Sequence, residues 1–372
     1  MKKSKKLAVV VGSTLALGAV AAAGITAARP GEHRAASVAG AAATTWPLVQ
    51  SSPKADAGTS LSGLAAAPDG TMWAAGGQQT STVHKPILQR LTGDTWSDVA
   101  LPAAAAPYRF NAVAATSASN LWLAGQLNTS GDSNAVLNWN GTAWRTFKTP
   151  LNFQPSDIAT TGPGNTWAVS TSAAKHWNGT SWTDTPIGIK PYAITAVSPT
   201  SAWAVGWAGA GQPATAHWNG TSWTTVPFPQ VDGTVRGEVA SALSDVYAAS
   251  ENDVWAVGTA EVSDGAGGSD GRSMLAHWDG TKWTNVLGAP RTYLRKVASD
   301  GAGGIWVSAL GGAMRHRTAA GVWSDETLAQ PAGTTVIPSA LALRPGTTTM
   351  WAVGTTTTDA TRWFDLAHWR SN

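Results

Sequence analysis

The chain has 372 residues, of which 43% are hydrophobic and 13% charged, and it contains no cysteine. This length is enough to bury a large core without disulfides, and the missing thiols exclude cysteine chemistry and a lipid-anchored cysteine. The formal net charge is +3, but removing residues 1–28, with four lysines and no acid, leaves about −1. Because no basic stripe remains, the composition excludes a nucleic-acid partner.

The N-terminus predicts export. Lysines at positions 2, 3, 5 and 6 precede an apolar run from Leu7 to about Ala28, which ends in small residues. This pattern is typical of a secretory signal of bacterial style, covering residues 1–28. An uncleaved membrane anchor is the alternative, since the run is long enough to cross a bilayer, but its alanine and glycine content favours cleavage. Residues 29–45 are rich in alanine, glycine and threonine, and we expect a flexible tether.

Residues 46–372 contain a sevenfold tryptophan repeat. Seven apolar segments, Trp-Ala-Val-Gly or close variants, begin at Trp73, Trp122, Trp167, Trp203, Trp255, Trp306 and Trp351. Six of them are followed by a second tryptophan behind a polar turn, at Trp96, Trp144, Trp182, Trp223, Trp283 and Trp323. Short strands with tight turns, repeated every 36 to 52 residues, predict an all-β, seven-bladed β-propeller with four-stranded antiparallel blades. A β-sandwich would not need seven similar units.

The Asn-Gly turns between third and fourth strands, such as Asn219-Gly220, predict hairpins in which both central residues have positive φ. We assign the repeated tryptophans to packing between blades, where wide flat rings can fill the wedge between fanning sheets. Five histidines occupy the same position of the repeat, in the third strand, namely His176, His217, His277, His316 and His368. One per blade, they are spread around a ring, so we expect packing and no metal cluster.

The last copy ends at His368-Trp369, before its fourth-strand tryptophan. The segment Thr44–Val49 reads like Ser222–Val226. We therefore predict that an N-terminal strand carrying Trp46 completes the last blade and closes the ring, because an open seam would leave unpaired strand edges.

The unit resembles the kelch repeat, best shown by Trp73–Gly77 followed by Leu91–Trp96. Leu91–Trp96 also resembles the turn of tectonin-type lectin repeats. The segment His-Trp-Asn-Gly-Thr-Ser-Trp is a partial echo of the sialidase Asp box, with Trp177 or Trp218 at the aspartate position. The resemblance covers residues 46–372 and implies a secreted propeller; it does not imply an activity, because propellers host many unrelated functions.

Variable loops indicate which face carries function. The connections from second to third strand, and from each fourth strand to the next blade, emerge on one face, which we call the loop face. The longest are Gly258–Arg272 and Pro227–Val239. Function concentrates in such loops on a rigid scaffold. The aromatic and basic residues that the repeat does not require are expected there, as ligand-binding residues: Tyr108, Arg109, Tyr192, Trp207, Arg291, Tyr293, Arg295 and Trp363.

Aromatic rings beside arginine predict stacking and hydrogen bonding to a sugar. We therefore expect a secreted or cell-surface, monomeric, non-catalytic propeller that binds an extracellular glycan or polymer. A protein-interaction scaffold that binds a surface protein is one alternative, and a polysaccharide hydrolase or lyase is another. No catalytic residue and no cofactor is predicted. The acidic loop with Asp264 and Asp270 is a weak calcium candidate, because it lacks the spacing of an EF-hand loop.

Overall fold

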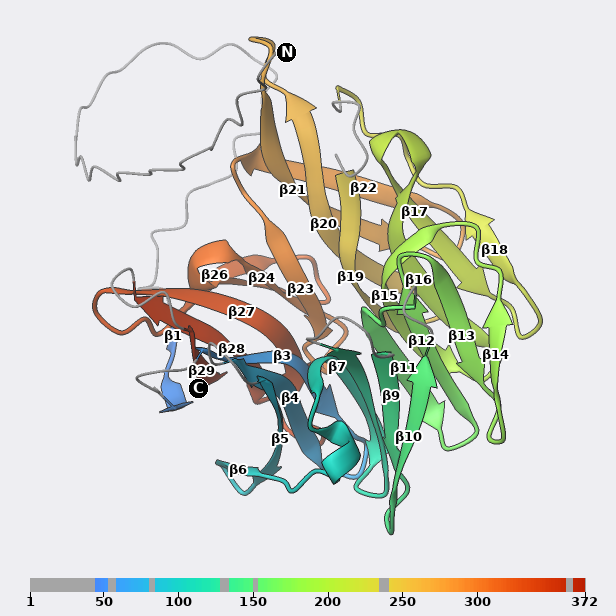
Figure 1. Cartoon of the computed structure of the whole chain (residues 1–372). Coiled ribbons are helices and arrows are strands. Elements are labelled where there is room, and N and C mark those ends of the chain that lie inside the picture. The colour runs from blue at the N-terminus through green and yellow to red at the C-terminus, as the bar shows by residue number, and fades with distance from the viewer. Residues whose placement is uncertain are drawn as a thin grey trace, which may run out of the picture. The chain divides into compact units, whose positions relative to one another are not determined.

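The structure, a computed structural model, describes residues 44–52, 58–79, 84–127, 134–149, 153–233, 241–358 and 364–371. Residues 43–372 form one compact unit by themselves. Seven sheets, here blades I to VII, follow one another along the chain (Figure 1). Blade I comprises β3 (Gly58–Ala66), β4 (Met72–Gln79), β5 (His84–Thr92) and β6 (Thr95–Asp98). Blade II comprises β7 (Tyr108–Ser117), β8 (Asn120–Leu127), β9 (Asn134–Trp139) and β10 (Trp144–Thr149). Blade III comprises β11 (Asp157–Gly162), β12 (Asn165–Ser170), β13 (Ala173–Trp177) and β14 (Trp182–Thr185).

Blades IV and V comprise β15 (Lys190–Ser198), β16 (Ser201–Ala208), β17 (Gln212–Trp218) and β18 (Trp223–Val226); and β19 (Ser241–Ser250), β20 (Asp253–Ser263), β21 (Ser269–Trp278) and β22 (Trp283–Pro290). Blade VI comprises β23 (Leu294–Ser299), β24 (Ile305–Ala309), β25 (Ala313–Arg317) and β26 (Trp323–Leu328), extended by β1 (Thr45–Trp46). Blade VII comprises β27 (Thr334–Leu343), β28 (Met350–Thr358), β29 (Phe364–Arg370) and β2 (Leu48–Ser52).

The seven-bladed β-propeller predicted from the repeat is confirmed. The strands of each blade pair antiparallel in chain order, apart from the N-terminal additions to blades VI and VII. The first strand of each blade contacts the first strand of the next, and β27 of blade VII contacts β3 of blade I. The first strands therefore line a central axis, and the ring is closed.

Tryptophans fill the interfaces between blades, as predicted. All seven second-strand tryptophans are buried, with 9% or less of their surface exposed. At four interfaces a tryptophan of the following blade meets this ring edge-on, and Trp46 of β1 does the same for Trp306; the centroid distances are 5.0 to 5.6 Å and the interplanar angles 72° to 90°. This T-shaped arrangement is the favoured geometry for two aromatic quadrupoles. The repeat in the sequence is therefore a repeat of interblade packing.

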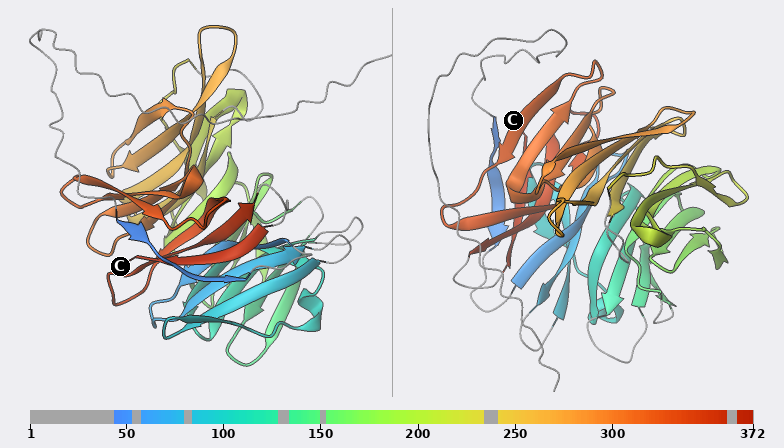
Figure 2. Two further views of the ribbon diagram at one scale, coloured as in Figure 1. Left: turned by 90° about the vertical axis from the view of Figure 1, so that its left-hand side faces the viewer. Right: turned by 90° about the horizontal axis from the view of Figure 1, so that it is seen from above.

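Closure by an N-terminal strand is confirmed, with one difference in detail. β2 pairs with β29 and completes blade VII, with Leu48 opposite Trp369; Figure 2 shows the blue N-terminal strands beside the red C-terminal ones. Trp46 itself lies before this pairing, in β1, which runs parallel to β26 of blade VI. Its ring is completely buried and meets Trp306 edge-on at 5.0 Å. Trp46 thus has the packing role of a fourth-strand tryptophan and also links blade VI to blade VII.

The predicted repeat position of two residues in blade VII is wrong. In blades III to VI the histidine pairs with the second-strand tryptophan, as His176 does with Trp167. In blade VII, Arg370 pairs with Trp351, so His368 and Trp369 lie two residues out of register. His368 is completely buried and stacks on Trp96 of blade I instead. The similar local sequence concealed this shift, because cross-strand pairing sets the register.

The predicted geometry of the Asn-Gly turns is also wrong. Gly220 has a φ of +94°, but Asn219 is not among the residues with positive φ. The asparagine acts through its side chain: Oδ1 accepts hydrogen bonds from the backbone N–H groups of Thr221 and Ser222 and from the Thr221 hydroxyl. This is an Asx turn, in which the amide oxygen substitutes for a backbone acceptor.

A bulge in the first strand explains the glycine of the repeated segment. In blade IV, pairing between β15 and β16 skips Tyr192, so Pro191 lies opposite Gly206 and Ala193 opposite Val205. A Cβ atom at Gly206 would come within 2.1 Å of the Lys190 carbonyl oxygen. The second-strand glycines of blades I, V and VII meet first-strand carbonyls in the same way. The glycine is needed because the bulge brings two backbones together.

We expect Gly206→Ala to destabilise the fold by about 2–3 kcal/mol, because the backbone of β15 must move to admit the methyl group. Gly209→Ala is the matched control, since a Cβ there has open space around it. Urea unfolding of both variants checks this expectation. Equal midpoints for Gly206→Ala and Gly209→Ala would contradict the proposed coupling of glycine and bulge.

Candidate functional site

The first-strand bulges form a ring around the central axis. Pairing with the second strand skips one residue in six of the blades, namely Ser62, Asn111, Tyr192, Ser244, Arg295 and Ser339. In blade III, Ser156 takes this place just before β11, and both its N–H and its hydroxyl donate to the Val169 carbonyl. Five of the seven residues lie just before a first strand or among its first four residues, toward the loop face, and Ser62 and Ser339 lie at the middle of theirs.

A cavity of about 200 Å³ occupies the channel at this level. Residues from all seven blades line it, and most are bulge residues or the residues that follow them. In four blades the following residue is small: Gly63, Ala112, Ala193 and Ala340. In the other three it is charged: Asp157, Asp245 and Lys296. We call these three residues the channel triad.

Each carboxylate of the channel triad joins two blades. Asp157 Oδ2 accepts a hydrogen bond from the backbone N–H of Ile194 in blade IV, at 2.9 Å. Asp245 Oδ2 accepts one from Val297 in blade VI, at 2.8 Å. The Lys296 ammonium donates to Asp245 Oδ1 at 3.3 Å. Two carboxylates and one ammonium therefore share the cavity, which holds an excess of one negative charge when all three are ionised.

Partial burial in the channel shifts the pKa values of these three groups. Burial raises the pKa of Asp157 to about 6, although the Lys296 ammonium and the Ile194 N–H both oppose the rise. Burial also raises the pKa of Asp245 against the same ammonium. For Lys296, burial lowers the pKa, but the Asp245 and Asp157 carboxylates outweigh it and the pKa is raised. Lys296 therefore stays charged at neutral pH, and Asp157 takes up a proton as the pH falls through about 6.

The structure separates the residues predicted to bind a ligand. Tyr108 is 3% exposed and packs in the core of blades I and II. Trp207 lies within β16 and not in a loop, is 8% exposed, and carries the Lys190 ammonium 4.2 Å above its ring. Neither ring offers a free face to a sugar. Tyr192 is half-buried in the channel lining, and Arg295 is an exposed bulge residue.

Of the remaining predicted residues, Arg109 lies in β7, and Arg291 and Tyr293 lie in the connection between β22 and β23. The Arg109 side chain packs close to Gly77 of blade I, and the Tyr293 ring packs on Gly271. Arg291 is 85% exposed at its side chain, has a φ of 62°, and donates from Nε to Asp270 at 3.2 Å. Trp363 lies outside the described residues. The structure therefore brings Tyr192 and Arg295 to the ring of bulges and leaves the other described residues of this set apart from it.

The channel triad was missed by sequence reasoning, although a signal existed. When first strands are aligned on the Trp-Ala-Val-Gly segments, three charged residues fall where other blades carry glycine or alanine. A charge at a position that is otherwise small marks a departure from the packing rule. The predicted loop Gly258–Arg272 is also corrected, because β20 and β21 extend through most of it and leave residues 264–268 as the connection.

The two calcium candidates have other partners. Asp264 Oδ1 accepts the N–H groups of Ala266 and Gly268 within its own loop, and Asp270 pairs with Arg291. Within the described ranges, no group of three or more histidines and acids is placed to hold a metal ion. Among the same residues, no helix is long and apolar enough to cross a membrane.

No protein-family model and no curated protein matches this sequence. Solved propellers match its fold. A structure of YCF48 bound to D1 peptide has a TM-score of 0.55 at 14% identity, covering 88% of this chain and 98% of that one. YCF48 from Cyanidioschyzon merolae has a TM-score of 0.53 at 13% identity, covering 87% and 98%. Chaetomium thermophilum Sqt1 bound to the N-terminus of ribosomal protein L10 has 0.53 at 9%, covering 84% and 97%. These similarities establish the propeller fold and do not assign its blades to the kelch or tectonin type.

Proposed function

We propose that this chain is a non-catalytic protein-binding propeller, and that a peptide segment of its partner inserts a cationic group into the channel from the loop face. The observation that carries the proposal is the channel triad, two carboxylates facing one ammonium inside a cavity of about 200 Å³. Such a cavity is the size of one long side chain. The fold neighbours support a peptide ligand, since one is described with D1 peptide and another with the N-terminus of L10.

The charge balance selects the ligand chemistry. Asp245 is already paired with Lys296, which leaves Asp157 as the acceptor for a lysine, an arginine or an amino terminus. The Asp157 side chain also accepts two backbone N–H groups, which hold it in place. A charged hydrogen bond to this partly buried carboxylate is worth more than one at the fully exposed surface. The channel therefore favours the protein-interaction alternative. The glycan hypothesis is weakened, because Tyr108 and Trp207, two of the rings expected to stack on a sugar, are buried.

We expect a fluorescent Gly-Ser pentapeptide with one central lysine or arginine to bind the full chain at pH 7.5, and a glutamate or leucine version to bind at least tenfold more weakly. Asp157→Asn should weaken lysine-peptide binding at least tenfold, because asparagine can still accept one of the two N–H groups but lacks the charge. Asp184→Asn is the matched control, since Asp184 is 75% exposed and pairs with Lys175 outside the channel. Fluorescence anisotropy gives the affinities.

The same titration has a defined pH dependence. Because Asp157 takes up a proton near pH 6, affinity for the lysine peptide should fall as the pH drops through about 6. Equal binding of all four peptides, or no effect of Asp157→Asn, would contradict the proposed site. Binding on a glycan array would favour the carbohydrate hypothesis instead, and turnover of a polysaccharide would indicate the hydrolase or lyase alternative.

We also propose that residues 1–28 direct export and are removed, so that the propeller acts outside the cell or at its surface. The support is the charged N-terminal region and apolar run of the sequence. The N-terminal sequence of the protein recovered from the culture medium tests this directly, and an intact N-terminus in the membrane fraction would indicate an anchor.

A further inference from the structure

The outermost strand of blade V differs from its counterparts. β22 pairs on one side with β21, and among the described residues no strand pairs with its other edge. It has eight residues, whereas β6, β10, β14 and β18 have four to six. The last strand of blade VI, by contrast, is covered by β1. β22 is therefore a long row of backbone groups that another strand could pair with.

β22 ends in a bulge and Pro290, which block pairing there, but the composition of residues 283–287 does not protect the rest of this edge. Proteins commonly place charged residues on exposed edge strands to prevent pairing. β22 reads Trp-Thr-Asn-Val-Leu-Gly-Ala-Pro and has no charged residue, whereas β6, β10 and β14 carry charges and the uncharged β18 is only four residues long. Val286 in its middle is 69% exposed, the highest value among the exposed large hydrophobic residues described.

A cavity of about 480 Å³ lies beside this strand, between blades V and VI. Its apolar lining comes from both blades and includes Leu275, Val286, Leu294, Val307 and Trp323. Blade VI also differs at its third strand, where Arg317 stands at the position that Trp177, Trp218 and Trp278 hold in blades III to V.

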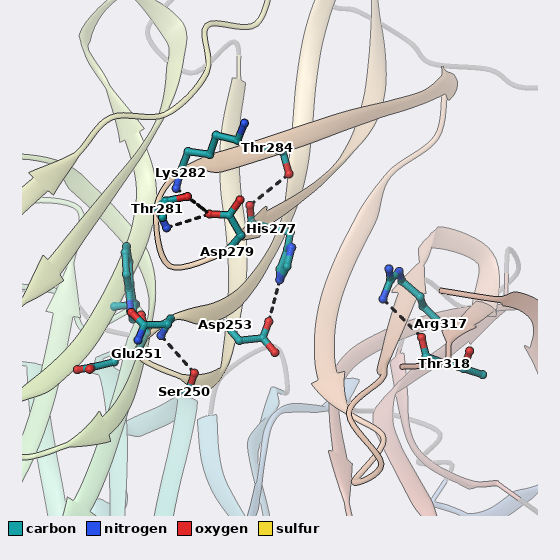
Figure 3. Close-up of polar contacts among 12 residues, drawn as sticks. Ser250, Glu251, Asp253, His277, Asp279, Thr281, Lys282, Thr284, Arg317 and Thr318 are labelled. Atoms are coloured by element: carbon teal, nitrogen blue, oxygen red, sulfur yellow. Dashed lines mark hydrogen bonds and ion pairs between the residues drawn. The ribbon is translucent and has the colours of Figure 1, made fainter. Parts of the chain in front are cut away.

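The Arg317 guanidinium lies 4.8 Å over the Trp255 ring, where three earlier interfaces have a third-strand tryptophan against the second-strand ring. Figure 3 shows Arg317 on blade VI and the contact between His277 and Asp253 on blade V.

We infer that β22 and this cavity form a second docking site, where an extended apolar segment of a partner protein adds to blade V as a further strand. Backbone hydrogen bonds along β22 would hold the segment, and one of its apolar side chains would enter the cavity beside Val286. This mode of binding takes its affinity from the strand edge and its specificity from the pocket. The site is separate from the channel triad.

The ends of the strand specify the charge of the partner. Lys282 precedes β22 and Arg291 follows it, and both are exposed; Arg291 contacts Asp270 through Nε at 3.2 Å, and its side chain is still 85% exposed. A partner segment with carboxylates at its two ends would complement them. A second copy of this chain fits less well, because an antiparallel pair of β22 strands would place Lys282 of one copy near Arg291 of the other. The inferred occupant is therefore a foreign segment, apolar in the middle and acidic at both ends.

The test uses a fluorescent nonapeptide, Glu-Thr-Val-Thr-Leu-Thr-Val-Thr-Glu, and the full chain. We expect saturable binding by fluorescence anisotropy. Val286→Lys should weaken peptide binding at least tenfold. Val322→Lys should leave peptide binding unchanged, because Val322 is 63% exposed in the turn between β25 and β26. The peptide N-methylated at alternate residues should lose binding, because it can no longer donate its backbone hydrogen bonds. A version with lysine at both ends should bind at least tenfold more weakly.

Melting curves of the two valine variants should show that both fold, because both valine side chains are exposed. Asp157→Asn should bind the nonapeptide normally, so failure of the channel proposal and failure of this one are distinguishable. Three results would overturn the inference: no saturable binding up to millimolar peptide, equal losses in Val286→Lys and Val322→Lys, or full binding by the N-methylated peptide. A dimer in light scattering that Val286→Lys dissociates would also overturn it, by showing that a second copy occupies the edge.

Discussion

Deletion of residues 44–52 is expected to destabilise the propeller by at least about 5 kcal/mol, enough to prevent folding or to lower the melting temperature by more than about 10 °C. The deletion removes β2 from blade VII and Trp46 from the interface of blades VI and VII. It leaves an edge of β29 unpaired and exposes the rings of Trp306 and Trp369, which pack in the same cluster as Trp46. Thermal unfolding of the full chain and the deletion variant gives the difference.

Two further variants show whether the loss of stability is specific to residues 44–52. Trp46→Ala alone should cost about 3–5 kcal/mol, as expected for a completely buried tryptophan, because it leaves a large hole and removes the indole N–H that donates to Glu326. Deletion of nine residues upstream, positions 30–38, is the control and should leave the melting temperature unchanged. An unchanged melting temperature after loss of residues 44–52 would refute ring closure by the N-terminal strand.

Stability should fall in acid through His368. This side chain is completely buried against Trp96, and burial lowers its pKa from 6.5 to about 3. The unfolded chain therefore binds the proton first. The contribution of His368 is complete above about pH 6.5 and is lost as the pH falls toward 3, by roughly 3 kcal/mol between pH 7 and pH 4.

The two channel carboxylates act in the opposite direction. The pKa values of Asp157 and Asp245 are raised above 3.8 in the folded state, so the folded chain binds these protons first and gains stability as the pH falls. The His368 effect is therefore read from the difference between the full chain and His368→Phe, which keeps a ring on Trp96. Urea unfolding from pH 7 to pH 4 should show a smaller loss for the variant. Parallel curves would show that His368 does not titrate with folding.

The sequence was sufficient for the architecture because the largest side chains mark every interface. Seven buried second-strand tryptophans and their partners recur at blade intervals, and no other residue type could carry so clear a period. The register of blade VII could not be predicted in the same way. His368 and Trp369 copy a local motif, but cross-strand pairing with β28 places Arg370 where the motif suggested His368.

The candidate site was harder to predict for a related reason. Trp207 and Tyr108 were singled out because the repeat does not require them, yet both are buried, since strand ends near the axis are covered by neighbouring blades. The channel triad depends on the first-strand bulges, which exist only once two strands are paired. Asp157, Asp245 and Lys296 are far apart in sequence, and ring closure brings them into one cavity.

The titration of Asp157 itself tests the central claim most directly. Carbon-13 labelling of aspartate carboxyls, with Asp157→Asn to assign the signal, reports its pKa in the free protein and in the presence of the lysine pentapeptide. The free value should be about 6, and saturation with the peptide should lower it by at least one unit, because a bound cation favours the ionised carboxylate. A pKa of Asp157 that does not change at saturating peptide would contradict the proposal that the channel holds the cationic group of a partner.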